Sequence, residues 1–215
     1  MHIAEQSPPE IQLHTDPTFV CVTDQTPTRA RIESTIKAGF AAAFNAQVQQ
    51  FMPLLCELQV ASDTCTLGLR CASTPLFIEQ YLPTPIEHFV NASRQHIYEL
   101  GNLCSSHRRA TLAHFVVVNE ALYNSGTEYL VFCATRKVRA LLKVLGINCT
   151  EIALANSHAL LHPADWGSYY DNQPTICVVD LKYAHECILN TPALFNIKQQ
   201  YIQATAKLLH KLETL

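Results

Sequence analysis

Charged residues and glycine are both scarce in this chain of 215 residues. Asp, Glu, Lys and Arg together make up 15%, against roughly 25% in an average soluble domain. With apolar residues at 48%, so low a charge excludes an intrinsically disordered chain. Six glycines and eleven prolines exclude collagen-like and Gly-rich linker sequences. A net charge of −3 gives no electrostatic basis for binding nucleic acid or anionic lipid.

The chain also lacks segments typical of export or membrane insertion. Residues 1–10 contain neither a basic stretch nor an apolar one, so the sequence predicts no signal peptide. No apolar run approaches the roughly 18 residues of a membrane-spanning helix. We therefore expect a cytoplasmic protein without a transmembrane segment.

Cysteine, in contrast, is abundant, with nine residues and no CxxC pair. Several lie inside apolar runs, such as residues 130–133 and 175–179, where thiols behave as small buried hydrophobic groups. The sequence thus favours nine reduced thiols over a disulfide framework. His158 and His162 have the spacing of a metal pair, but Pro163 would end any helix that carries them, and no metal site is expected.

Hydrophobic periodicity and helix-terminus signals predict alternating strands and helices. The predicted strands are residues 19–22, 51–60, 65–71, 96–104, 129–134, 147–153 and 175–181. The predicted helices run from Pro27 through Phe44, over 86–94, from Ser105 or Ser106 as the cap to Gly126, over 136–145, and from Pro192 through Leu212.

This order indicates the α/β (α+β) class, with a mixed, mostly antiparallel sheet, helices on both of its faces, and a C-terminal helix. We expect a flexible arm at 1–18, one domain at 19–182 and a helical extension at 183–215. The strand–helix–strand unit at 96–134 should form a right-handed crossover. Because polar Asn102 and the two serines stand at a strand end, we also expect a gap between the strands at 96–104 and 128–134.

The turn at Ser105–Ser106 and Arg108–Arg109 lies between a strand and the start of a helix. Free backbone amides and the positive end of the helix dipole make such a turn an anion site. It then suits a phosphate or pyrophosphate group. The alternative is a capped helix with two solvated arginines.

Three carboxylates, Glu79, Glu87 and Glu99, are candidates for general-base chemistry. Glu99 alternates with apolar neighbours in a strand, so its side chain faces either solvent or a cleft. Beside a donor site, such a carboxylate can hold or deprotonate an amine. The alternative is three surface carboxylates.

Two further features have a functional and a structural interpretation. Cys104 precedes the candidate anion turn and is either a nucleophile or a buried thiol. The aromatic stretch 166–171, WGSYYD, is either a lid over an apolar ligand or simple packing.

Several motifs together resemble one family. These are FIEQYL at 77–82 with PIE at 85–87, ELGNL at 99–103, VFCATR at 131–136, WGSYYD at 166–171, and Pro174. In this order they are similar to the signature of the bacterial thermostable hemolysin family, and they cover roughly residues 19–182. That family is similar in predicted fold to the GNAT acyltransferases, especially the acyl-homoserine-lactone synthases. The resemblance therefore implies a GNAT-like acyltransferase domain.

The resemblance also implies roles for particular residues. It places Glu99 as the base, with Tyr169 or Tyr170 as the acid for the departing thiolate. It places the acyl donor, an acyl-CoA or an acyl-carrier-protein thioester and no tightly bound cofactor, against Leu103, Cys104, Ser105, Ser106, Arg108 and Arg109. It places the small amine acceptor near Glu79, Tyr81, Glu87, Asn102, Thr135 and Trp166.

Two positions depart from the GNAT pattern. The turn at 105–110 has no glycine, so a carrier-protein donor is as well supported as coenzyme A. Cys133 replaces the commoner threonine of its motif. The alternatives to an acyltransferase are a non-catalytic binder of this fold and a membrane-acting hemolysin. For the latter, the amphipathic segment 192–215 is the candidate, and its other expected use is a homodimer interface.

Overall fold

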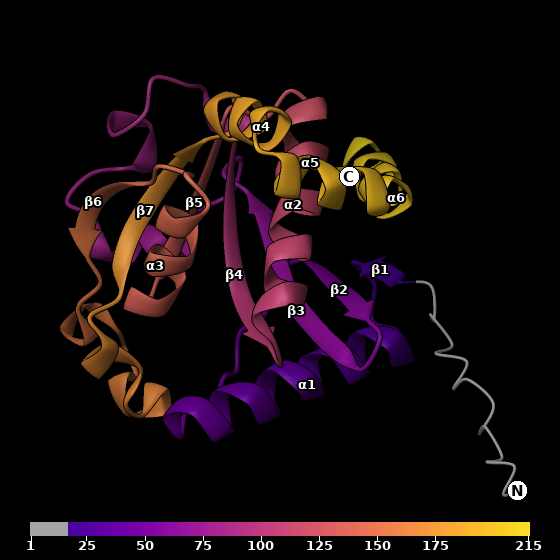
Figure 1. Cartoon of the computed structure of the whole chain (residues 1–215). Coiled ribbons are helices and arrows are strands. Elements are labelled where there is room, and N and C mark those ends of the chain that lie inside the picture. Colours follow the sequence, from indigo (N-terminus) through magenta and orange to yellow (C-terminus); the bar gives the residue numbers. More distant parts are fainter. Residues whose placement is uncertain (1–16) are drawn as a thin grey trace, which may run out of the picture.

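The computed structural model describes residues 17–215 of the chain. Its centre is a seven-stranded sheet in the order β1–β2–β3–β4–β5–β7–β6 (Figure 1). Neighbouring strands are antiparallel except β4 and β5, which run parallel. The expected mixed, mostly antiparallel sheet is confirmed. The strands are β1 (Thr18–Val22), β2 (Leu54–Val60), β3 (Asp63–Cys71), β4 (Ile97–Ser105), β5 (Tyr129–Ala134), β6 (Thr150–Leu154) and β7 (Thr175–Asp180).

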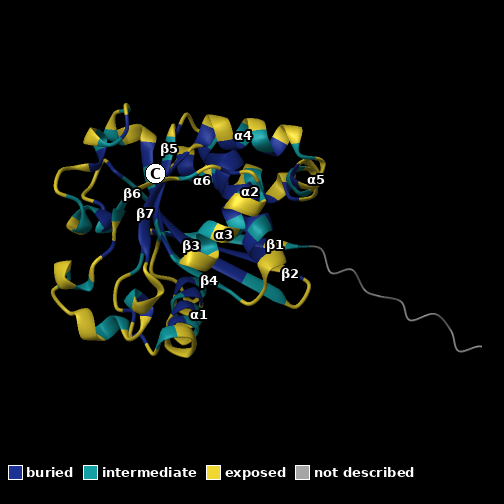
Figure 2. Cartoon of the chain, turned by 60° about the vertical axis from the view of Figure 1, so that its left-hand side comes forward, coloured by how far each residue is buried: buried dark blue, intermediate teal, exposed yellow. Residues whose placement is uncertain are grey.

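Helices cover both faces of this sheet, as expected. Helix α2 packs on one face with the C-terminal helices, whereas α1 crosses the other face beside short 3₁₀ turns (Figure 2). The helices are α1 (Pro27–Phe44), α2 (Arg108–Asn124), α3 (Arg136–Val144), α4 (Leu181–Asn190), α5 (Pro192–Gln200) and α6 (Ile202–Glu213). The 3₁₀ turns are Phe77–Tyr81, Ile86–His88, Arg94–His96, Ser157–Ala159, Pro163–Trp166 and Tyr169–Asn172.

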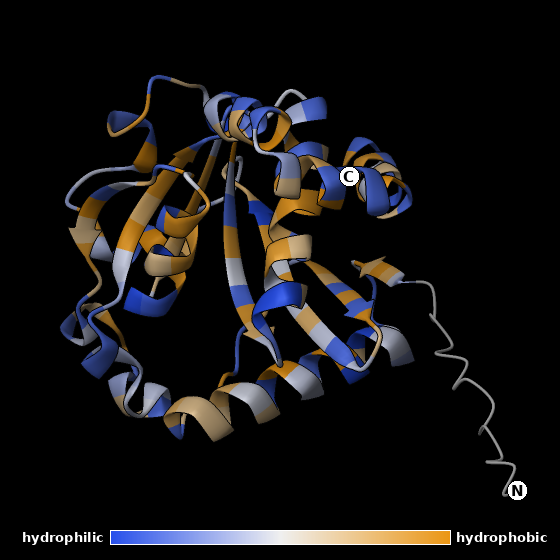
Figure 3. Cartoon of the chain, in the orientation of Figure 1, coloured by the Kyte–Doolittle hydropathy of each residue, from blue (hydrophilic) through white to orange (hydrophobic). Residues whose placement is uncertain are grey.

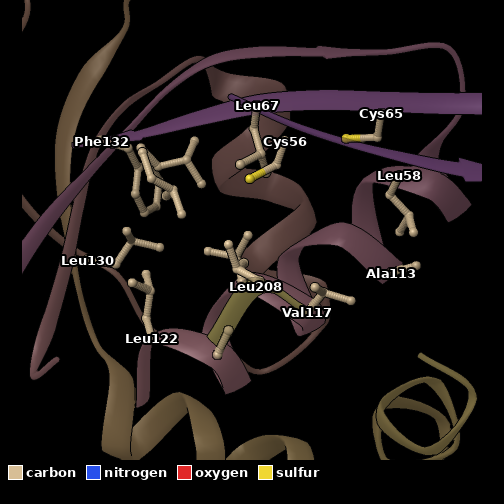
Figure 4. Close-up of a cluster of buried hydrophobic side chains, with 14 of the residues drawn as sticks. Cys56, Leu58, Cys65, Leu67, Ala113, Val117, Leu122, Leu130, Phe132 and Leu208 are labelled. Atoms are coloured by element: carbon tan, nitrogen blue, oxygen red, sulfur yellow. The ribbon is translucent and has the colours of Figure 1, made fainter. Parts of the chain in front are cut away.

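The main core lies between the sheet and α2. Alternate residues of a strand face opposite sides of a sheet, so Leu58 and Leu67 point toward α2 and meet Val117 (Figure 4). Leu130 and Phe132 of β5 join the same cluster. The intervening residues of the strands face α1 and the 3₁₀ turns, and they include Arg70 of β3 and Glu99 of β4.

The two long helices begin at side-chain caps. Thr26 accepts a hydrogen bond from the Arg29 amide at 3.2 Å, and Pro27 occupies the first turn of α1, as predicted. Helix α2 is capped differently from the prediction. His107 accepts from the Arg109 amide through Nδ1 at 3.2 Å, while the Ser105 and Ser106 hydroxyls donate to backbone carbonyls. The prediction that one of the serines caps α2 was wrong.

Two other expectations need correction. Residues 86–94 do not form a helix beyond a short turn at Ile86–His88. Glu79 and Arg94 tie the loop 79–94, which contains Pro83 and Pro85, into a compact non-helical shape. The final helix is two helices that meet at Tyr201, and α4 was not predicted. The arm expected at 1–18 lies outside the described residues, apart from its last two residues.

The C-terminal helices are held against α2 by a buried carboxylate. Glu120 of α2 is fully buried and pairs with Lys198 of α5 at 2.6 Å and with His185 of α4 at 2.9 Å. The apolar residues Leu208 and Leu212 of α6 are buried in the main core. The apolar face that suggested a membrane or dimer contact is therefore covered within the chain. In the described part of the chain, no helix has the length and apolarity to cross a membrane.

Candidate active site between β4 and β5

The parallel strands β4 and β5 separate partway along their length. Their pairing covers only Ile97–Leu100 against Tyr129–Phe132, although β4 continues to Ser105 and β5 to Ala134. Figure 1 shows the two strands together at one end and diverging toward α1. The predicted gap between these strands is confirmed. Beyond Leu100, the β5-facing backbone groups of β4 have no strand partner among the described residues.

A β-bulge in β4 accompanies this divergence. Gly101 lies opposite Gly68 and Cys104 lies opposite Thr66, so β4 has one residue more than β3 between these pairs. Asn102 takes up the extra length with φ of 52°, a conformation that asparagine tolerates better than most residues. Its side chain accepts from the Met52 amide at 2.8 Å and donates to the Gln50 carbonyl at 3.2 Å. A bulge increases local twist, which turns the end of β4 away from β5.

A cavity of about 1140 Å³ passes through the sheet at the divergence. This volume lies above the roughly 300–1,000 Å³ of common small-molecule sites. On the α2 side it is an apolar pouch, lined by Phe115, Val118, Phe132, Leu141 and Ile147. On the α1 side it is lined by aromatic and polar residues. One continuous space therefore joins an apolar compartment to a polar one.

Glu99 is the buried carboxylate of the polar compartment. Its side chain is 1% exposed and lines the cavity. The carboxylate accepts from the backbone amides of Phe77 and Ile78, both at 2.9 Å. Burial raises the pKa of Glu99 to about 7, although these two hydrogen bonds and the nearby charge of Arg70 act to lower it. A carboxylate with this pKa exchanges a proton near neutral pH, as a general base must.

Aromatic side chains surround the same compartment. Tyr81, Trp166, Tyr169 and Tyr170 all line the cavity, and the Tyr81 and Tyr170 hydroxyls share a hydrogen bond. Burial raises the pKa of Tyr170 to about 12 and that of Tyr169 well above its usual range. The Tyr169 hydroxyl donates to the Cys133 carbonyl at 3.4 Å. Both tyrosines stay protonated at neutral pH, so each hydroxyl can donate a hydrogen bond.

Glu79 and Glu87 do not reach this cavity. Both pair with Arg94, and Glu79 also accepts from the Leu76 and Ile86 amides at 2.9 and 3.0 Å. Although partial burial opposes it, these hydrogen bonds lower the pKa of Glu79 to about 2. The two carboxylates thus hold the loop that supports Phe77 and Ile78. The structure separates them from the acceptor compartment in which the resemblance had placed them.

The helix N-termini of α2 and α3 border the cavity at its other end. Leu103, Ser105, Ser106 and Arg108 line it, together with Thr135 and Lys137 at the start of α3. Arg109 does not line it. Both helices start where β4 and β5 are apart. Their free backbone amides and the cations Arg108 and Lys137 therefore face one opening. The candidate anion turn is placed at the cavity, with His107 as its cap.

Cys104 has a packing role. Its sulfur lies against Gly39 of α1, where a β-carbon would collide with it. Burial raises the pKa of Cys104, and the thiol lies 3.9 Å from the Thr35 carbonyl. A protonated thiol in this position is a poor nucleophile. All nine cysteines are unpaired in the structure.

The contributions of α1 and of Arg70 to the cavity were not predicted from the sequence. The C-terminal half of α1 is its more apolar half (Figure 3), and Gly39, Phe40 and Phe44 line the cavity. The signal was the run of small residues AGFAAA at 38–43, which permits close approach to β4. Arg70 lines the cavity from β3, directly opposite Glu99. Nothing in its local sequence distinguished it.

The mixed sheet, the divergent parallel pair and the helix that starts at the divergence define a GNAT-like fold of the acyl-homoserine-lactone-synthase type. Residues 22–185 match the model of the thermostable hemolysin family, and the chain belongs to that family. The resemblance of its motifs is thereby confirmed. Among curated proteins, none matches the chain significantly.

Solved structures with this fold are distant in sequence. TofI, in a ternary complex with an inhibitor and MTA, has a TM-score of 0.57 at 13% identity, over 82% of this chain and 98% of that one. FeeM, an N-acyl amino acid synthase from uncultured soil microbes, has a TM-score of 0.54 at 14% identity, over 83% and 97%. The acyl-homoserine-lactone synthase LasI has a TM-score of 0.52 at 9% identity, over 77% and 89%.

Proposed function

We propose that this protein is an N-acyltransferase that moves an acyl group from a thioester to a small amine. The amine nitrogen attacks the thioester carbonyl, the new C–N bond forms and the C–S bond breaks. The products are an amide and a free thiol. The observation that carries the proposal is the single cavity between β4 and β5, which joins an apolar pouch to a compartment with a buried carboxylate.

The donor enters, in this proposal, between the diverging strands. The unpaired backbone edge of β4 beyond Leu100 can pair with the amides of a pantetheine arm, as an added strand would. Phosphate of coenzyme A or of a carrier protein's pantetheine then meets the start of α2, beside Arg108 and Lys137. The shape of the site supports a thioester donor of either kind.

The acyl chain occupies the apolar pouch. Its walls come from α2, α3 and the α2-facing side of β5, and they include Phe115, Val118 and Leu141. Each methylene buried there contributes about 0.8 kcal/mol, or about a fourfold gain in affinity. We therefore propose a donor with a fatty acyl chain.

Glu99 receives the proton of the attacking amine. It is buried beside the reaction compartment and its pKa of about 7 suits this role. The proton finally reaches the thiol product. Tyr170, with its hydroxyl in the same cavity, donates a hydrogen bond to the departing sulfur. Two proteins that share this fold, the acyl-homoserine-lactone synthase LasI and the N-acyl amino acid synthase FeeM, support an acyl-transfer function.

The test is product identification with purified protein. The protein is incubated with pooled amines and with acyl-CoA or acyl-carrier-protein donors whose chains run from 4 to 16 carbons in steps of about two carbons. Each step should raise donor affinity roughly tenfold or more. Mass spectrometry then identifies N-acyl products and the free thiol. We expect amide formation that strengthens with chain length until the pouch is full. Donor binding without amide formation would instead indicate a non-catalytic binder, and lysis of vesicles without either would support a membrane-acting protein.

A further inference from the structure

Arg70 stands out because it brings an unpaired cation into the polar compartment. It is half-buried, lines the cavity and donates one hydrogen bond, at 3.3 Å, to the Pro75 carbonyl. Among the residues that the structure describes, no Asp or Glu side chain forms an ion pair with it. A guanidinium has five N–H donors in a planar fork that matches a carboxylate. Most of these donors are therefore available to a ligand.

The position of Arg70 relative to Glu99 is fixed by the sheet. The two residues lie directly opposite each other in the antiparallel pair β3–β4 and face the same side. Directly opposite residues have β-carbons about 4.5–5.5 Å apart. The Glu99 carboxylate is turned onto the Phe77 and Ile78 amides and forms no ion pair with the guanidinium. The compartment thus presents one cation and one carboxylate side by side.

Arg70 is too far from the donor's phosphate to serve it. Arg70 is five residues from Cys65, the β3 residue opposite Ser105, a distance of roughly 17 Å at about 3.3 Å per residue. Ser105 precedes the start of α2, where Arg108 and Lys137 border the opposite end of the cavity. The cations at that end and Arg70 therefore serve different groups.

We infer that the amine acceptor is an α-amino acid with an apolar side chain, whose carboxylate binds Arg70. This inference rests on the proposed acyl transfer and names its acceptor class. The ammonium group of an amino acid lies one carbon away from its carboxylate, so it falls beside Glu99 when the carboxylate is held by Arg70. Phe77, Tyr81 and Trp166 provide an aromatic surface for the side chain.

The experiment compares acceptors that differ only in the carboxylate. Purified protein and its best acyl donor are given an equimolar mixture of the twenty amino acids with 3-methylbutylamine and 2-phenylethylamine, the decarboxylated forms of leucine and phenylalanine. We expect N-acyl derivatives of apolar amino acids to dominate. For the preferred amino acid, kcat/KM should exceed that of its decarboxylated amine by about 30-fold or more.

Variants then test Arg70 itself. In Arg70→Gln, the ratio of the two kcat/KM values should fall toward one, chiefly through KM for the amino acid, and Arg70→Lys should retain part of it. Arg108→Gln, at the other end of the cavity, is the matched control and should leave the ratio as it is. Circular dichroism melts check that each variant folds.

The outcomes separate the inference from the function on which it rests. Amides formed only from amines without a carboxylate, or a ratio that Arg70→Gln does not change, would overturn the inference while acyl transfer stands. No amide from any acceptor, with no thiol released from the donor, would refute the proposed acyl transfer itself.

Discussion

Glu99→Gln should stabilise the protein much more at pH 8 than at pH 5. The wild-type carboxyl group has an ordinary pKa of 4.5 and a pKa of about 7 in the folded protein, because burial disfavours its charge. A raised carboxyl pKa means that folding favours the protonated form. The contribution of this group is therefore fully present below pH 4.5 and is lost as the pH rises through 7.

The magnitude follows from the difference between the two pKa values. At 1.36 kcal/mol for each pH unit, ionisation of Glu99 costs the folded state about 3 kcal/mol above pH 8. Glutamine has nearly the same shape and stays neutral. Like the protonated acid, it can accept one amide hydrogen bond with its carbonyl oxygen. The two proteins should therefore differ by only about 1 kcal/mol at pH 5, where the unfolded carboxyl has begun to ionise.

The assay is urea denaturation of both proteins at pH 5, 6, 7 and 8. The free energies of unfolding should differ by little at pH 5, and the variant should gain about 3 kcal/mol by pH 8. All other titrating groups are shared, so the difference isolates Glu99. A difference that does not depend on pH would refute the assigned pKa. A wild type that is the more stable at pH 8 would show that the two amide hydrogen bonds outweigh the cost of burial.

Four further outcomes are expected. The wild-type kcat should rise with pH through about 7, and Glu99→Gln should lower kcat by about 10²–10⁴-fold, because a general base is lost. A flat pH profile of kcat, or near-wild-type turnover in the variant, would contradict the role of Glu99 as a base. Gly39→Ala should destabilise the protein by about 1–3 kcal/mol through its collision with the Cys104 sulfur. The double change with Cys104→Ala should recover most of that loss, and additive losses would count against this contact. Lys198→Met should cost about 3 kcal/mol in urea unfolding, since it leaves the buried Glu120 without its lysine; an effect below about 1 kcal/mol would indicate that His185 suffices. Thiol titration in denaturant without reductant should count nine cysteines, and seven would reveal a disulfide.

The candidate site was predictable from the sequence wherever it depends on neighbours along the chain. The strand 129–134 and the aromatic turn 166–171 are local patterns, and the structure places both at the cavity. The position of Glu99 in a strand with apolar neighbours was also visible, but not which side it faced. The family motifs, rather than hydrophobic periodicity, identified Glu99 as the candidate base.

Polar residues at a strand end indicated the divergence of β4 from β5. The sequence by itself also determined the order of the seven strands, the first three helices and the apolar face of α1, but not α4 or the break at Tyr201. Periodicity predicts such features because burial repeats with the geometry of each element. The tertiary structure decided which charges meet. Arg94 pairs with Glu79 and Glu87 in a supporting loop, and Glu120 pairs with Lys198 from a helix far along the chain. Arg70 lies beside Glu99 and forms no ion pair with an acidic side chain of the described residues. These contacts depend on the paths of distant segments, because an electrostatic interaction depends on distance in space and not on separation along the chain.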